Sequence, residues 1–214
     1  MTIRLKIDPA KPDDAPLAKA GEILRAGGIL AFPTETFYGL GADARQEAAV
    51  ERIFRLKGRA VQNPISVIVD SDREIIPLVV EFPAVAQILM DKFWPGALTI
   101  VFAASPAVLP RLTAGTGKIG LRVSSHPVAR IIAKLLAGPL TATSANLSGG
   151  PECSTADEVL SVFGDGLDAV VDGGTTAGDL GSTIMDVTVS PPVILREGVI
   201  SRADILHALG IPIG

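Results

Sequence analysis

The chain has 214 residues, of which 48% are hydrophobic and only 4% aromatic, and its formal net charge is −4. This length suits one domain with an aliphatic core, and the net acidity argues against a protein that coats nucleic acid by bulk electrostatics. The single cysteine, Cys153, excludes an intramolecular disulfide. No signal peptide or apolar run of about 18 residues is evident, so we expect a cytoplasmic protein without membrane contact.

Helix and strand patterns alternate along the chain. Acidic residues with Pro16 at the start and a glycine pair at the end predict a helix over 13–28. Hydrophobic spacing and Pro or capping-box signals predict further helices over 44–57, 82–94, 127–138 and 155–163, and a last one from Ser201. Short apolar runs predict strands at 29–32, 65–69, 98–104, 119–123, 140–143, 169–171, 182–189 and 193–198.

These strands alternate with helices early in the chain and cluster near its end. That order favours a mixed sheet covered by helices over a uniformly parallel one. We therefore expect a single α/β domain over residues 1–214, with its motif-bearing core at about 14–209.

The segment "FPTETFYGLGAD" (32–43) reads as a loop between a buried strand and a helix, with Thr34, Glu35 and Thr36 followed by glycines. Open α/β sheets commonly bind ligands at such loops, and glycines permit a tight turn or close approach of the backbone. A plain connecting loop with local Ser/Thr capping explains the same residues equally well.

Lys57 and Arg59 close a predicted helix, with Gly58 between them. The helix dipole favours cations there, which is sufficient reason for both. Together with the later segment "TATSANLSGG", however, they suit a site for a phosphorylated anion. Ser144 and Asn146 in that segment have no nearby base, so we interpret them as hydrogen-bonding groups for phosphate or ribose.

Arg122 lies in the strand "IGLRV", whose alternation puts Gly120 and Arg122 on one face. A lone arginine in so apolar a strand needs an anionic partner: either a structural ion pair or a ligand carboxylate gripped by the guanidinium. Gly120 is expected to leave open space beside it. Arg196 repeats the pattern, although the adjacent Glu197 and the end of the strand explain it equally well as a structural residue. The Gly-rich segment 172–186 either closes over a ligand or is simply a long turn.

Seven segments in this order resemble the YrdC-like family of threonylcarbamoyl-AMP synthases. They are "FPTETFYGLGADA", "IFRLKGRAVQNPISVIV", "FWPGALTIVF", "GKIGLRVSSHP", "TATSANLSGG", "GSTIMDV" and "ILREGVIS", and they span about residues 20–205. The resemblance implies an open twisted sheet around a large, concave, positively lined cavity, in the short form of the family without its extra C-terminal domain.

The resemblance further implies a nucleotidyltransferase that converts L-threonine, bicarbonate and ATP to threonylcarbamoyl-AMP, pyrophosphate and water. The product serves N6-threonylcarbamoyladenosine formation in ANN-decoding tRNA, through downstream tRNA threonylcarbamoyl-transfer proteins. No protein nucleophile is implied, and Mg²⁺ is held by ATP phosphates rather than by side chains. By the same resemblance L-threonine is bound by Thr36, Arg122, Ala142 and Ser182. ATP is bound by Lys57, Arg59, Asn63, Lys118, Ser144, Asn146 and Arg196, with Lys57 and Arg59 neutralising charge.

The chain departs from the family pattern at a few positions. Ile68 stands where some archaeal relatives have a histidine, and "PECST" (151–155) replaces a Ser-rich segment, so an ATP contact near Glu152 is left open. Two alternatives remain: an RNA-binding module of the same shape, or a paralogue that uses another carbamoyl-type substrate. The acidity of the chain and its few aromatic residues weigh against RNA.

Overall fold

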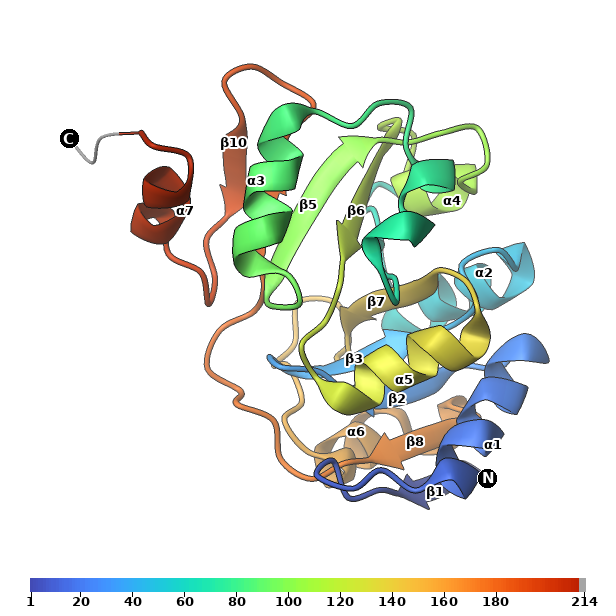
Figure 1. Ribbon diagram of the computed structural model, residues 1–214. Coiled ribbons are helices and arrows are strands. Elements are labelled where there is room, and N and C mark those ends of the chain that lie inside the picture. Colours follow the sequence, from blue (N-terminus) through green and yellow to red (C-terminus); the bar gives the residue numbers. More distant parts are fainter. Residues whose placement is uncertain (212–214) are drawn as a thin grey trace.

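The computed structural model describes residues 1–211, which fold around one ten-stranded sheet (Figure 1). Its strand order is β1-β8-β2-β3-β7-β4-β6-β5-β9-β10. The strands are β1 (Ile3–Lys6), β2 (Leu30–Pro33), β3 (Tyr38–Gly41), β4 (Ser66–Ile68), β5 (Leu98–Ala103), β6 (Lys118–Arg122), β7 (Leu140–Ser144), β8 (Ala169–Asp172), β9 (Thr183–Asp186) and β10 (Val193–Arg196). The sheet contains both parallel pairs, such as β4–β6 and β5–β9, and antiparallel pairs, such as β2–β3 and β5–β6. The predicted α/β class and mixed sheet are confirmed.

The helices cover both faces of this sheet. They are α1 (Asp14–Arg25), α2 (Glu47–Lys57), α3 (Ala84–Phe93), α4 (Pro110–Thr113), α5 (Pro127–Leu136), α6 (Ala156–Phe163) and α7 (Arg202–Ala208). In Figure 1, α1 and α5 lie side by side next to β2 and β8, and the same elements are in contact. Within the described residues, no helix is long and apolar enough to cross a membrane.

Alternation along the strands separates two apolar clusters, one on each face. Leu30 and Phe32 pack in the cluster that contains α1 and α5, whereas Ala31 belongs to the cluster of α2, α3 and α6. The parallel register pairs Ile68 with Arg122, so Arg122 faces the same side as α1 and α5. Further along the sheet, over β6, β5 and β9, that face becomes polar.

The segment 32–43 is not one loop, as the sequence suggested, but a β-hairpin. β3 pairs antiparallel with β2, from Leu30–Gly41 to Pro33–Tyr38, which leaves a four-residue turn. Gly41 serves packing here, because a Cβ atom at this position would lie 2.6 Å from Cε1 of Phe32. The glycines that suggested a loop therefore make room for the ring of Phe32 across the hairpin.

Two other elements were also missed. β1 pairs parallel with β8 at the edge of the sheet, and its "IRLK" sequence mixes charged and apolar residues because much of it is exposed. The short helix α4 lies inside the segment 105–118, which the sequence indicated only as turn-rich.

Candidate functional site

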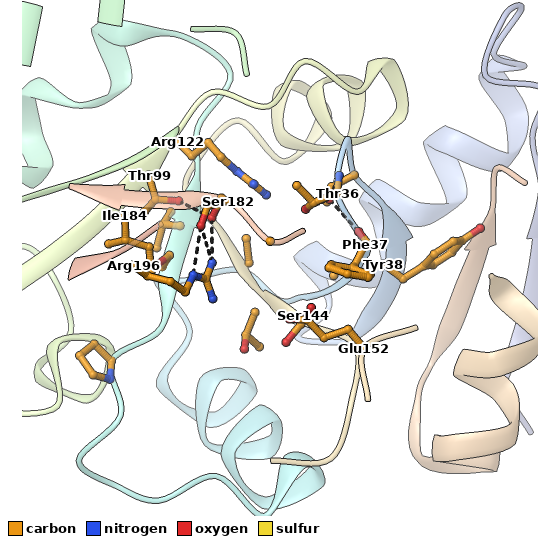
Figure 2. A pocket seen from close by; sticks show the side chains of 18 of the residues that line it. Thr36, Phe37, Tyr38, Thr99, Arg122, Ser144, Glu152, Ser182, Ile184 and Arg196 are labelled. Carbon is orange, nitrogen blue, oxygen red and sulfur yellow. Dashed lines mark hydrogen bonds between the residues drawn. The ribbon is translucent and has the colours of Figure 1, made fainter. Parts of the chain in front are cut away.

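A cleft of about 180 Å³ opens on the polar part of the sheet (Figure 2). Its wall is formed by the turn of the β2–β3 hairpin, by strands from β3 to β10 and by loops that follow them. The lining residues are Thr34, Thr36, Phe37, Tyr38, Gly39, Arg59, Pro64, Ser66, Val67, Thr99, Arg122, Ala142, Thr143, Ser144, Glu152, Gly181, Ser182, Ile184 and Arg196. Three arginines and one glutamate give this wall a net positive charge, as the family resemblance implied.

Strand register brings distant cleft residues into one row. In the parallel pair β5–β9, Thr99 lies opposite Ile184, and in the antiparallel pair β9–β10, Ile184 lies opposite Arg196. Arg122 lies on β6, the neighbour of β5 on its other side. Residues opposite one another in a sheet share a face, so four strands present their side chains to the same cleft.

Arg122 is the most deeply buried cation of the cleft, with 7% of its surface exposed. Its Nη1 lies 3.3 Å from Oε1 of Glu35, and its guanidinium makes no hydrogen bond to any described residue. Burial lowers the pKa of Arg122, an effect that Glu35 opposes and Arg196 reinforces. The N–H donors of Arg122 line the cleft and have no hydrogen-bond acceptor among the described residues, so this site favours an anionic ligand.

Thr36 lies in the hairpin turn, close to Arg122 in Figure 2. Its hydroxyl is 3.0 Å from that of Thr34, which in turn donates to the carbonyl oxygen of Phe37 at 2.7 Å. The backbone N–H of Thr36 also donates to the Thr34 hydroxyl. These bonds fix the turn, so the Thr36 hydroxyl is held at the cleft.

Ser182 lines the cleft and lies between Arg122 and Arg196 in Figure 2. Its Oγ is 3.1 Å from Oγ1 of Thr99, and Arg196 donates to its carbonyl oxygen through Nε and Nη2 at 3.1 and 2.7 Å. Arg196 therefore does two things: it lines the cleft, as predicted, and it fixes Ser182. Ala142 lies nearby on β7, opposite Ser66 of β4.

The other end of the cleft carries Arg59 and Ser144. Arg59 donates to the carbonyl oxygens of Asn63 and Pro64 at 3.1 and 2.7 Å, and burial lowers its pKa. The predicted helix end is confirmed, since Gly58 adopts a left-handed conformation with φ of 58°. Ser144 donates through Oγ to Oδ1 of Asn146 at 2.7 Å.

Lys57 is not among the residues that line the cleft, and its contact with ATP stays a prediction. It is only 2% exposed, and its ammonium donates to the carbonyl oxygens of Ser144 and Asn146 at 2.5 and 2.7 Å and to Oδ1 of Asn146 at 2.9 Å. All three N–H bonds are thus used inside the protein. Asn146, which also donates to the carbonyl of Gly150, is likewise buried. Both residues shape the loop that presents Ser144.

Two other predicted ATP ligands also lie off the cleft wall. Asn63 is exposed in the turn after Arg59, and only its carbonyl contacts that arginine. Lys118 begins β6, about 13 Å along the strand from Arg122 at roughly 3.3 Å per residue, and it pairs with Asp186 at 2.8 Å. Their contacts with ATP stay predictions.

The expected open space above Gly120 is not there. A Cβ atom at Gly120 would lie 2.8 Å from Oγ of Ser66 and 3.0 Å from Cγ2 of Thr99. The glycine lets these two polar side chains approach from the neighbouring strands, which narrows the floor of the cleft.

Sequence reasoning missed Thr99 and gave no role to Glu35. Thr99 is buried between Leu98 and Ile100 on an apolar strand, so its alternation with those residues was the available signal. Glu35 was visible in its motif, but nothing in the sequence indicated that it faces Arg122. Among the described residues, no group of three or more His, Cys, Asp or Glu side chains is arranged to hold a metal ion.

A family model for the Sua5/YciO/YrdC domain, described as "Telomere recombination", matches residues 22–198. The chain belongs to this family. Among its relatives, it is 39% identical to a threonylcarbamoyl-AMP synthase of Pyrococcus abyssi over 89% of this chain and 56% of that protein. It is also 36% identical to a putative threonylcarbamoyl-AMP synthase of Mycobacterium tuberculosis, over 95% and 93% of the two chains.

Solved structures of the family agree with the fold. P. abyssi Sua5 in complex with L-threonine superposes with a TM-score of 0.93 at 36% identity, over 98% of this chain and 61% of that one. Escherichia coli YciO gives 0.85 at 29% identity, over 93% and 97%. This chain spans 56–59% of the length of the P. abyssi and Bacillus subtilis synthases that it matches.

Proposed function

We propose that this protein is a threonylcarbamoyl-AMP synthase that joins L-threonine, bicarbonate and ATP. The observation that carries the proposal is the buried Arg122 guanidinium, which faces the cleft without a hydrogen-bond acceptor among the described residues. A planar fork of N–H donors suits the carboxylate of an amino acid. The names of the relatives and the L-threonine complex of P. abyssi Sua5 support the same choice of ligand.

The cleft offers different chemistry at its two ends. Arg122 and Thr36 lie at one end in Figure 2, and Ser144 and Glu152 lie at the other. We place the threonine carboxylate on Arg122, with hydroxyl groups of Thr36 and Ser182 beside it. The phosphates lie toward Arg59 and Arg196, where charge-assisted hydrogen bonds are stronger than neutral ones.

The reaction then needs no nucleophile from the protein. The threonine amine forms a bond to the carbon of bicarbonate or CO₂ and gives a carbamate, with loss of water when bicarbonate reacts. A carbamate oxygen then attacks the α-phosphorus of ATP, and the bond to the bridging oxygen breaks as pyrophosphate leaves. The protein aligns the reactants, and its fixed positive charges stabilise the pentacoordinate phosphorus of the transition state.

Magnesium enters this scheme with the nucleotide. Mg²⁺ is usually held by substrate phosphates and one or two carboxylates, and Glu152 is the carboxylate that lines the cleft. The metal supplies charge neutralisation to the phosphates when it is bound. We assign the product to N6-threonylcarbamoyladenosine formation in tRNA, with ATP, L-threonine and bicarbonate as substrates.

The test is pyrophosphate release from Mg²⁺-ATP by the purified protein. We expect release only when L-threonine and bicarbonate are both present, and much slower release with L-valine, which replaces the threonine hydroxyl by a methyl group. Release that does not depend on threonine, or none under any of these conditions, would contradict the proposal. Release with a different amino acid would instead indicate a paralogue with another substrate.

A further inference from the structure

Glu35 lies outside the cleft wall but contacts the residues that form it. Its Oε2 accepts a hydrogen bond from Oγ of Ser124, and its Oε1 faces Nη1 of Arg122 at 3.3 Å. Oε1 is buried and accepts no hydrogen bond from the described residues. A buried carboxylate is costly unless it is paired, so this placement depends on the charge of Arg122.

Arg122 depends on Glu35 in return. The ion pair with Glu35 is the only polar contact of its guanidinium within residues 1–211. An arginine side chain has several rotatable bonds, and holding it in one rotamer costs conformational entropy. The Glu35 carboxylate occupies one edge of the guanidinium, which leaves its other N–H groups for the cleft.

Glu35 also connects the turn of the β2–β3 hairpin with the end of β6 and the segment after it. It immediately precedes Thr36 in the turn of the β2–β3 hairpin, whereas Arg122 ends β6 and Ser124 follows it. Ser124 is itself fixed, because its Oγ accepts from the backbone N–H of His126 at 3.2 Å. A chain of contacts therefore runs from the hairpin turn to the segment after β6.

We infer that Glu35 is a positioning residue that sets Arg122 and Thr36 at the spacing needed to bind the substrate amino acid. This inference rests on the proposed function, since it assigns the roles of Arg122 and Thr36 to threonine. It differs from a purely structural ion pair in one respect. Loss of Glu35 should weaken binding of the amino acid specifically, whereas a structural role would lower stability and affect both substrates alike.

The discriminating variant is Glu35→Gln. Glutamine keeps the shape of the side chain and an oxygen that accepts from Ser124, but it removes the negative charge beside Arg122. A misplacement of about 1 Å in an active site can lower the reaction rate roughly 100-fold. By the same reasoning, we expect the Kd for L-threonine to rise by about 10- to 100-fold. The Kd for ATP, measured without threonine, should change by less than about twofold, as for independent sites.

Glu51→Gln is the matched control. Glu51 pairs with Arg111 at 2.8 Å, and neither residue lines the cleft. This control should leave both dissociation constants unchanged. Ser124→Ala is the second variant: it keeps the charge of Glu35 and removes the hydrogen bond that orients it, so it should weaken threonine binding by less than Glu35→Gln does.

Isothermal titration of the four proteins with L-threonine, and separately with Mg²⁺-ATP, decides the outcome. Selective loss of threonine affinity in Glu35→Gln, with a smaller selective loss in Ser124→Ala, supports the inference. Equal loss for both ligands, or no loss in either variant, overturns it. Should Glu35→Gln fail to fold, unchanged threonine affinity in Ser124→Ala overturns it as well. No threonine binding by the unaltered protein would instead overturn the proposed function, and the inference with it.

Discussion

The substitution Lys57→Met distinguishes a lysine that holds a loop from a lysine that contacts phosphate. Methionine retains the length and the apolar stem of the side chain but donates no hydrogen bond. The three acceptors of the ammonium are affected differently. Asn146 Oδ1 keeps the Ser144 hydroxyl and the Ser144 carbonyl keeps the backbone N–H of Asn146 at 3.0 Å, whereas the Asn146 carbonyl loses its only partner among the described residues.

One orphaned buried acceptor costs about 1–3 kcal/mol. We therefore expect Lys57→Met to lower the free energy of unfolding by about that amount, because relief of a buried charge offsets the loss of the other two bonds. The melting temperature should fall by about 2–4 °C for each kcal/mol in a chain of this size. ATP affinity should fall too, because Ser144 ends β7 next to the loosened loop.

Chemical denaturation and titration with Mg²⁺-ATP measure the two effects, and Arg59→Met is the comparison. Arg59 lines the cleft and is only partly buried, so its replacement should weaken ATP binding while stability changes by less than about 1 kcal/mol. If Lys57→Met were as stable as the unaltered protein or more so, and yet lost ATP affinity, Lys57 would contact phosphate and the loop-holding role would be refuted.

Three further predictions concern binding, packing and pH. Arg122→Ala should lose threonine binding by more than about 30-fold and ATP binding by much less; equal titration curves would remove its assigned role. Gly41→Ala should destabilise the fold by about 1–3 kcal/mol in denaturation experiments, because its methyl group would meet the Phe32 ring; an unchanged midpoint would contradict that packing. Burial, with the neighbouring Arg59 charge, lowers the pKa of Lys57 to about 8 from an ordinary value of 10.5. Between these two pH values Lys57 keeps its proton in the unfolded chain but has released it in the folded one. The free energy of unfolding of the unaltered protein, minus that of Lys57→Met, should therefore rise with pH. A difference that stays flat or falls would refute the pKa shift.

Much of the fold follows from local patterns in the sequence. Helices such as α2 and α5 have apolar spacing and clear stop signals, and the late clustering of strands predicted a mixed sheet. β3 was missed because Gly39 and Gly41 favour turns when read locally. In the fold they make room for the ring of Phe32 on the adjacent strand. Tertiary contacts that cross strands cannot be read from local propensity.

The site shows the same limit. The sequence identified Arg122 as a cation that needs an anion and left its partner open between an ion pair and a ligand, and the structure shows that Glu35 takes only one edge of it. Lys57 and Arg59 are two residues apart in one motif, yet the ammonium of Lys57 is buried against the segment 144–146 and Arg59 lines the cleft. Gly58 separates them by ending the helix with a left-handed residue, and the resulting change of direction is not visible in the motif itself.

The identity of the product is the most direct test of the account. The purified protein would be incubated with Mg²⁺-ATP, L-threonine and ¹³C-labelled bicarbonate, and the quenched mixture would be examined by mass spectrometry. We predict that a threonine-containing adenylate forms together with pyrophosphate, and that its mass increases by one mass unit when the bicarbonate is labelled. An adenylate without the label, or pyrophosphate without any adenylate that contains threonine, would contradict the central claim.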